Sequence, residues 1–263
     1  MATTKPKTTE VATKANSDLA FAQETVPSYI KQDGARGSEE VKQSDMVLPR
    51  LEIVQSQSPI KETDPDARDG MLFNTVTQEI LGDHVYFVPI YFRVEHLVWK
   101  DQDQGGGFFG SFPTLAQAED RKMSEVANGE NPEFIEIVDT PVHYGLMVNP
   151  ETGQSEQIVI SMAKTKSKVS RKWNAMIQIA GGDRFSRVYK ISSFTDENKK
   201  GQKFKNYVVQ PAGFPPEPVY REAERVYQGI AAGQIKAADH ASGAPDTSGT
   251  SDHAGGGDER GGI

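Results

Sequence analysis

The sequence predicts an α+β core, mostly antiparallel sheet with two or three helices, between two flanking segments that do not fold. Short β-rich runs separated by turn residues recur through residues 45–236, which is typical of an antiparallel sheet. Only two or three segments carry a helical spacing of apolar residues. A stretch of about 190 residues is enough for one ordinary hydrophobic core, so we expect a single core domain.

The flanking segments differ from this core in composition. Residues 1–44 hold six basic and six acidic residues, and their few large apolar residues show no sustained period. Residues 237–263 hold five acidic residues against Arg260 and no aromatic residue. Such segments bury too little apolar surface to fold. We therefore predict a disordered segment over 1–44, the core over 45–236 and a flexible acidic tail over 237–263.

The composition excludes several classes of protein. There is no cysteine, which excludes disulfides, thiolate zinc sites and a cysteine nucleophile. No run of about 18 apolar residues is present, so we expect no membrane-spanning helix. The first residues, MATTKPKTTEVATKAN, lack the apolar stretch of a secretory signal. These features favour a cytoplasmic protein without a membrane partner.

The first part of the core is predicted to be strand-rich. Residues 84–100 form either one long bent strand or a hairpin, with Pro89 at an edge or a bulge because proline cannot donate to the ladder. The turn residues of 149–153 predict a hairpin. Strands are predicted over 51–55, 71–76, 84–92, 93–100, 134–138, 142–148 and 157–162, and a helix over 114–127.

The clearest helix follows this region. One helix face is formed by Val169, Trp173, Met176, Ile177 and Ala180, and two glycines end the helix. This spacing places Trp173 in the core rather than on a binding surface. Strands over 187–194 and 204–210 come next, and a last helix is predicted over 218–235.

Charge is distributed unevenly along the core. Residues 45–156 hold 20 acidic and 7 basic residues, whereas residues 157–236 hold 6 acidic and 15 basic ones. The two parts therefore have net charges of −13 and +9, within a chain whose overall charge is −8. Most of the basic excess lies in 160–210. A concentrated basic region in an acidic protein indicates a nucleic-acid partner.

Aromatic residues alternate with these cations. Lysine and arginine neutralise phosphates, and aromatic faces stack on unpaired bases. On a strand, Arg187 and Tyr189 share one face, and Phe204 lies between Lys203 and Lys205. We therefore predict single-stranded DNA binding, with Tyr189 and Phe204 stacking on bases. The predicted contacts are Lys164, Lys166, Lys168, Arg171, Lys172, Arg184, Arg187, Tyr189, Lys190, Lys203, Phe204 and Lys205.

Other motifs carry no function. Residues 105–110 match the dinucleotide pattern G-x-G-x-x-G, but Pro113 follows where a helix should open, so we interpret them as a mobile glycine loop. The five histidines lack metal-ligand spacing, and no nucleophile elbow or phosphate-binding loop is present. We therefore expect no catalytic residue, no metal and no cofactor, and hence no enzyme.

Two segments resemble a group of small tailed-phage proteins. They are LPRLEIVQSQSP over 48–59 and GMLFNTVTQEILG over 70–82, followed by VYFVP over 85–89. The resemblance covers about 45–112 and weakly includes 172–174. Some of these proteins are similar to Drc, the single-stranded-DNA-binding RNA polymerase cofactor of podoviruses.

The resemblance implies an early phage protein that binds single-stranded DNA and works with a phage RNA polymerase at melted promoters. It also implies a fold unlike the usual OB barrel, and homo-oligomers. No binding residue is carried over from it. The motif residues themselves suit a scaffold, because Asn74 and Thr77 favour turn hydrogen bonds and Gly82 favours a tight turn.

A second function is compatible with the same charges. The basic part of the core would then dock an acidic partner protein, or the acidic part of a neighbouring copy, as a virion or polymerase accessory subunit. Such a protein would be an adaptor, and it would not bind DNA.

Overall fold

The computed structural model describes residues 36–41, 47–198 and 201–232. The chain divides into two units, 1–41 and 42–263, and the helices and strands that the structure describes lie in the second. The predictions of a disordered N-terminal segment and an acidic tail fall outside the described residues, apart from 36–41. No helix within the described ranges combines the length and the apolar run needed to cross a membrane.

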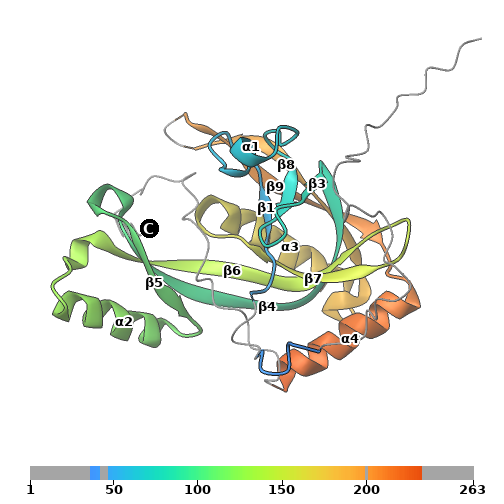
Figure 1. Cartoon of the computed structure of the whole chain (residues 1–263). Coiled ribbons are helices and arrows are strands. Elements are labelled where there is room, and N and C mark those ends of the chain that lie inside the picture. The colour runs from blue at the N-terminus through green and yellow to red at the C-terminus, as the bar shows by residue number, and fades with distance from the viewer. Residues whose placement is uncertain (1–35, 42–46, 199–200, 233–263) are drawn as a thin grey trace, which may run out of the picture. The chain divides into compact units, whose positions relative to one another are not determined.

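The second unit is an α+β domain built on two antiparallel sheets (Figure 1). The larger sheet has the order β7-β6-β4-β8-β9, with β5 paired to the far part of β4, and the smaller has the order β1-β2-β3. The described strands leave β7 and β9 as separate edges, so the large sheet is not a closed barrel. The strands are β1 Leu51–Ile53, β2 Leu72–Asn74, β3 Ile80–Gly82, β4 His84–Lys100, β5 Gly107–Phe112, β6 Ile135–Val148, β7 Ser155–Ser161, β8 Val188–Glu197 and β9 Lys203–Gly213.

Four α-helices are described, where the sequence predicted two or three. They are α1 Ile60–Thr63, α2 Leu115–Ala127, α3 Ser167–Ala180 and α4 Glu217–Ala231, and α1 is a single turn that the sequence pattern did not predict. Short 3-10 turns complete the domain: η2 Gln102–Gln104, η3 Pro132–Phe134, η4 Lys164–Lys166 and η5 Arg184–Ser186. In Figure 1, α2 lies beside β5 at one end of the long β4–β6 ribbon, and α4 lies near the other end.

The two longest strands, β4 and β6, are each continuous. β4 is one continuous strand with a register shift between Pro89 and Tyr91, as expected of a proline at a bulge. β6 is also continuous, although the sequence predicted two strands in this region. The prediction of a mobile glycine loop over 105–110 was wrong for its second part. Residues Gly107–Phe112 form strand β5, which pairs with β4. Its Phe109 and Phe112 pack with Val98 of β4.

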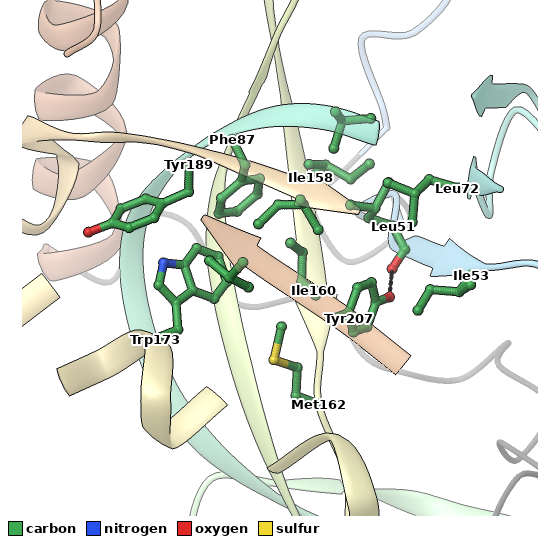
Figure 2. Packing of buried hydrophobic residues seen from close by; sticks show 13 residues of the cluster. Leu51, Ile53, Leu72, Phe87, Ile158, Ile160, Met162, Trp173, Tyr189 and Tyr207 are labelled. Carbon is green, nitrogen blue, oxygen red and sulfur yellow. Dashed lines mark hydrogen bonds between the residues drawn. The ribbon is translucent and has the colours of Figure 1, made fainter. Parts of the chain in front are cut away.

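One face of the large sheet carries the main core. α3 and the small sheet cover this face, and the buried cluster includes Phe87, Trp173, Tyr189 and Tyr207 (Figure 2). The Tyr207 hydroxyl donates a hydrogen bond of 2.7 Å to the backbone oxygen of Leu51, which joins β9 to β1. The predicted core position of Trp173 is confirmed, since its side chain is fully buried.

The other face of the sheet is covered by α4 along β4 and β6. Val88 and Leu146 of the sheet pack with Val219 and Val226 of α4, and Phe185 of η5 joins them. Close packing fixes Gly145 in β6, because a Cβ there would lie 2.4 Å from the Phe87 ring. The two core clusters thus place α3 and α4 on opposite faces of one sheet.

Candidate nucleic-acid interface

The exposed side of α3 carries three cations and no acidic residue. α3 forms because its apolar residues recur at helical spacing and bury Trp173 against the sheet, and it ends at Gly181 with φ +69°. The same period places Lys168, Arg171 and Lys172 together on the outer side of the helix, where all three are exposed. We name these three residues the α3 basic face.

Within the described residues, no carboxylate neutralises the α3 basic face. Within the described part of the chain, none of its three cations lies within ion-pair distance of a carboxylate. Cations elsewhere differ: Arg221 and Arg225 of α4 are paired with Glu224 and Glu222. Unpaired cations on one surface create the positive potential that attracts a polyanion.

The lysines on either side of α3 are more constrained. Lys164 is exposed but forms an ion pair of 3.4 Å with Glu136 of β6. Lys166 is buried, with its ammonium 5.6 Å from the centre of the Tyr207 ring. Lys166 therefore stabilises the junction between η4 and β9, and we withdraw it as a surface phosphate contact.

On β9, Lys203 is exposed, whereas Lys205 is held by its neighbours. The Lys205 ammonium donates to the Thr195 hydroxyl at 2.9 Å, and its backbone bonds to the Gln55 side chain. Among the described residues, Lys203 has no ion-pair partner and extends the basic region toward the β8–β9 turn.

The predicted contact track is divided between the two faces of the sheet. Lys190 pairs with Tyr86 and Gln210, whereas Lys205 pairs with Thr195. Paired residues on neighbouring strands point to the same face, so Lys190 shares a face with Gln210. Gln210 and Lys205 are an odd number of residues apart on β9 and therefore point to opposite faces. Lys190 and Lys205 thus lie on opposite faces of the sheet. Arg187 lies next to β8, with its guanidinium 4.4 Å from the centre of the Phe214 ring. Lys190 thus lies on the face of the sheet away from α3, and Arg187 is engaged with Phe214.

The two predicted stacking residues are in the protein interior. Tyr189 is 1% exposed and packs edge-on against Trp173, with ring centres 5.6 Å apart (Figure 2). Phe204 is 8% exposed. A buried ring offers no face to a base, so the stacking role predicted for Tyr189 and Phe204 is corrected to a structural one.

Arg184 is also structural. One of its guanidinium nitrogens lies 2.8 Å from His143 Nδ1 and 2.8 Å from Asn174 Oδ1, and the group lies over the Phe92 ring. Burial lowers the pKa of Arg184 to about 10, so the guanidinium stays charged at neutral pH. Its donors join η5 to β6 and α3, which removes Arg184 from the predicted DNA contacts.

A second buried polar cluster lies on β4. The fully buried Glu95 carboxylate accepts hydrogen bonds from Arg93, from Ser111 at 2.8 Å and from the Tyr144 hydroxyl at 2.7 Å. Burial, and then the negative charge of Glu95, raise the pKa of the Tyr144 hydroxyl. In the described residues no cluster of acidic and histidine side chains could hold a metal ion.

Sequence reasoning missed the aromatic residues that are accessible. Phe214 is 70% exposed and Phe194 is 43% exposed. Strand alternation was a signal for Phe194, because it lies on the face of β8 opposite to the buried Tyr189 and Ile191. Phe214 follows β9 directly and had no such pattern.

The turn residues Asn74, Thr77 and Gly82 act as scaffold, as the sequence predicted. Asn74 Oδ1 accepts backbone N–H bonds from Val76 and Thr77, and Thr77 accepts one from Glu79. Gly82 has φ +91°, which allows the turn from β3 into β4. These residues therefore shape the β2–β3 hairpin and the turn into β4.

Comparisons with known proteins identify one family. No match was found among curated proteins or among solved structures. A family model described as Pam3 phage gp34-like protein matches residues 16–236, which is most of the chain. The chain therefore belongs to the Pam3 phage gp34-like family of bacteriophage proteins.

Proposed function

We propose that this phage protein binds single-stranded DNA without strict sequence preference, using the α3 basic face. The observation that carries the proposal is the lack of carboxylate partners for Lys168, Arg171 and Lys172 within the described residues. DNA phosphates can take the place of carboxylates beside these cations. When they do, the DNA releases its bound counterions, and this release is the main source of sequence-tolerant affinity.

The partner is proposed to be a single strand rather than a duplex. The cations lie on the outer side of α3 and at the start of β9. A flexible strand can follow such a surface, whereas a straight duplex meets it at few points. The likeness to podoviral polymerase cofactors adds a phage RNA polymerase as a proposed partner at opened promoters.

Fluorescence anisotropy with a labelled single strand of about 30 nucleotides, and with the matched duplex, tests the proposal. We expect tighter binding of the single strand. The variant K168Q/R171Q/K172Q should lose at least about tenfold in affinity, because it removes three phosphate contacts.

The matched control is K61Q/R221Q/R225Q, which removes three cations that are paired with acidic residues. Its affinity should stay within about twofold of the unchanged protein. Equal losses in both variants would show that only net charge matters, and absence of single-strand binding would assign the α3 basic face to an acidic protein partner.

A further inference from the structure

The outer edge of strand β7 is only partly covered by the rest of the described chain. The Val159 N–H donates to the Pro49 carbonyl at 2.9 Å, so this N–H points away from β6. Outward and inward backbone groups alternate along an antiparallel edge strand, so the N–H and C=O groups of Gln157 and Ser155 also point outward. In the described residues, none of these four groups has a hydrogen-bond partner.

A proline limits how far the chain itself covers this edge. Arg50 forms a parallel bridge with Val159, which directs the chain before Pro49 toward Gln157. The next bond in that direction would join the N–H of residue 49 to the Gln157 carbonyl, and proline has no N–H. The chain leaves the edge here, and Leu48 packs on the α4 side of the sheet. The backbone of Gln157 is therefore open to another strand.

A cavity of about 700 Å³ lies along the open edge, a volume typical of ligand sites. Its base includes Leu146 and Val219, which pack together and are almost fully buried. Gln157 pairs with Leu146 across the β6–β7 ladder, so its side chain lies on this α4 side of the sheet. The walls are the Leu48–Pro49 segment and, on α4, Pro218 and Glu222. A strand added to β7 would place alternate side chains in this cavity.

The other side of the same edge carries a carboxylate without a cation. Glu156 pairs with Met147, which packs against the main core, so its side chain lies on the face away from α4. It is exposed and accepts a hydrogen bond of 3.1 Å from Asn74. Across the described ranges, no lysine or arginine lies within ion-pair distance of Glu156. An added strand would therefore meet apolar surface on one side and negative charge on the other.

We propose that this edge binds an extended peptide segment of another protein, which adds to the large sheet as an antiparallel strand beside β7. Peptide residues opposite Gln157 and Ser155 exchange both backbone bonds with them and place apolar side chains in the cavity. The peptide residue between these two faces Glu156, so a lysine or arginine fits there. The occupant is thus an extended segment with an apolar–basic–apolar pattern.

The charge of the edge also favours a foreign peptide over a second copy. Two β7 edges that paired antiparallel around Glu156 would bring two carboxylates opposite each other, which is destabilising. The edge contains none of the residues of the α3 basic face, so peptide binding and DNA binding are independent.

An NMR titration of the full chain with the peptide STVKVTS tests the backbone contacts. We expect binding that slows amide exchange at Ser155 and Gln157, with little change at Glu156, which already bonds to β6. Methyl groups on both valine nitrogens should weaken binding by about tenfold or more, because two N–H donors are lost. A methyl group on the lysine backbone nitrogen is the control, since this N–H points away from β7 and its loss should have little effect.

The charge contact is tested with STVEVTS, which should bind about two- to fivefold more weakly than STVKVTS. E156Q keeps an acceptor for Asn74 and should abolish this preference for lysine. E151Q is the matched control and should retain the preference, because Glu151 is an exposed carboxylate in the turn of the same hairpin and does not line the cavity.

Three results would overturn the inference. They are absence of STVKVTS binding, equal affinity for the valine-methylated peptide, and an unchanged lysine preference in E156Q. Amide protection at Gln157 that rises with protein concentration, without any peptide, would assign the edge to a second copy instead. Affinity for the single strand dT30 should be the same in E156Q and the unchanged protein, so a failure of the peptide site leaves the proposed DNA binding intact.

Discussion

His143 is a buried histidine whose ring nitrogens are both engaged. Arg184 donates to Nδ1, so Nε2 carries the hydrogen and donates to Ser170 at 2.8 Å. The ring also stacks on Trp173, with ring centres 4.3 Å apart. Burial, together with the charge of Arg184, holds the pKa of His143 well below its usual value of 6.5. The folded protein therefore keeps this histidine neutral.

The lowered pKa predicts an acid-sensitive fold. Below the unfolded pKa of about 6.5, unfolded chains bind a proton at His143 that the folded protein does not bind, so stability falls as pH decreases. The loss should approach about 1.4 kcal/mol per pH unit from this one group and end below the folded pKa. Urea unfolding at about pH 7 and pH 5.5 measures it.

H143Q separates this effect from general acid destabilisation. Glutamine can accept from Arg184 and donate to Ser170 without titrating. We expect H143Q to lose less stability than the unchanged protein between the two pH values, and H96Q, at a surface pair with Asp139, to behave like the unchanged protein. An identical loss in H143Q would mean that His143 is not the responsible group.

Single residues also show why part of the candidate site was not predictable. The sequence places Arg187 and Tyr189 on one face of a strand, but which face is covered depends on where α3 and α4 pack. α3 covers Tyr189, and η5 directs Arg184 inward to His143. Local alternation cannot determine either outcome. The exposed cations of α3 were predictable, because the apolar period of the helix fixes its outer side.

At the scale of elements, the outer edge of β9 is held by one side chain. Gln55 Nε2 donates to the Lys205 carbonyl, and the Lys205 N–H donates to Gln55 Oε1, both at 2.8 Å. The amide thus replaces the next strand of the sheet at this position. Ser193 reinforces the contact by donating to the Gly70 carbonyl at 2.6 Å.

Removal of this amide should destabilise the domain. Q55A leaves a partly buried N–H and carbonyl of Lys205 without partners, which we expect to cost about 1–3 kcal/mol in the free energy of unfolding. Q57A, two residues along the chain and exposed, should change stability by less than about 0.5 kcal/mol. Amide hydrogen exchange should accelerate at Lys205 in Q55A alone, and unchanged exchange there would contradict this role.

Most elements were predictable because they carry strong local patterns. The Asn149–Gln154 turn, the Trp173 helix and the last helix all formed near their predicted positions. β5 was missed because its glycines weaken the strand pattern, and pairing with β4 compensates. β1 and β2 are shorter than predicted, since the small sheet pairs over only three residues of each strand.

At the scale of the whole molecule, the charge asymmetry predicts salt-sensitive self-association. The acidic surplus of 45–156 can meet the basic region of another copy, an attraction that weakens as the screening length falls below about 10 Å above 0.1 M salt. We expect sedimentation velocity to show oligomers at low salt and the 28.9 kDa chain at high salt. Oligomers that persist at high salt would require an apolar interface instead.

The central claim is that Lys168, Arg171 and Lys172, which have no carboxylate partner in the described part of the chain, contact DNA phosphates. The most direct test is the slope of log affinity against log salt concentration for dT30, measured on the unchanged protein and on K168Q/R171Q/K172Q. Each lost phosphate contact reduces the slope by about 0.7, so we expect the variant's slope to be shallower by about 2. Equal slopes for the two proteins would contradict the claim.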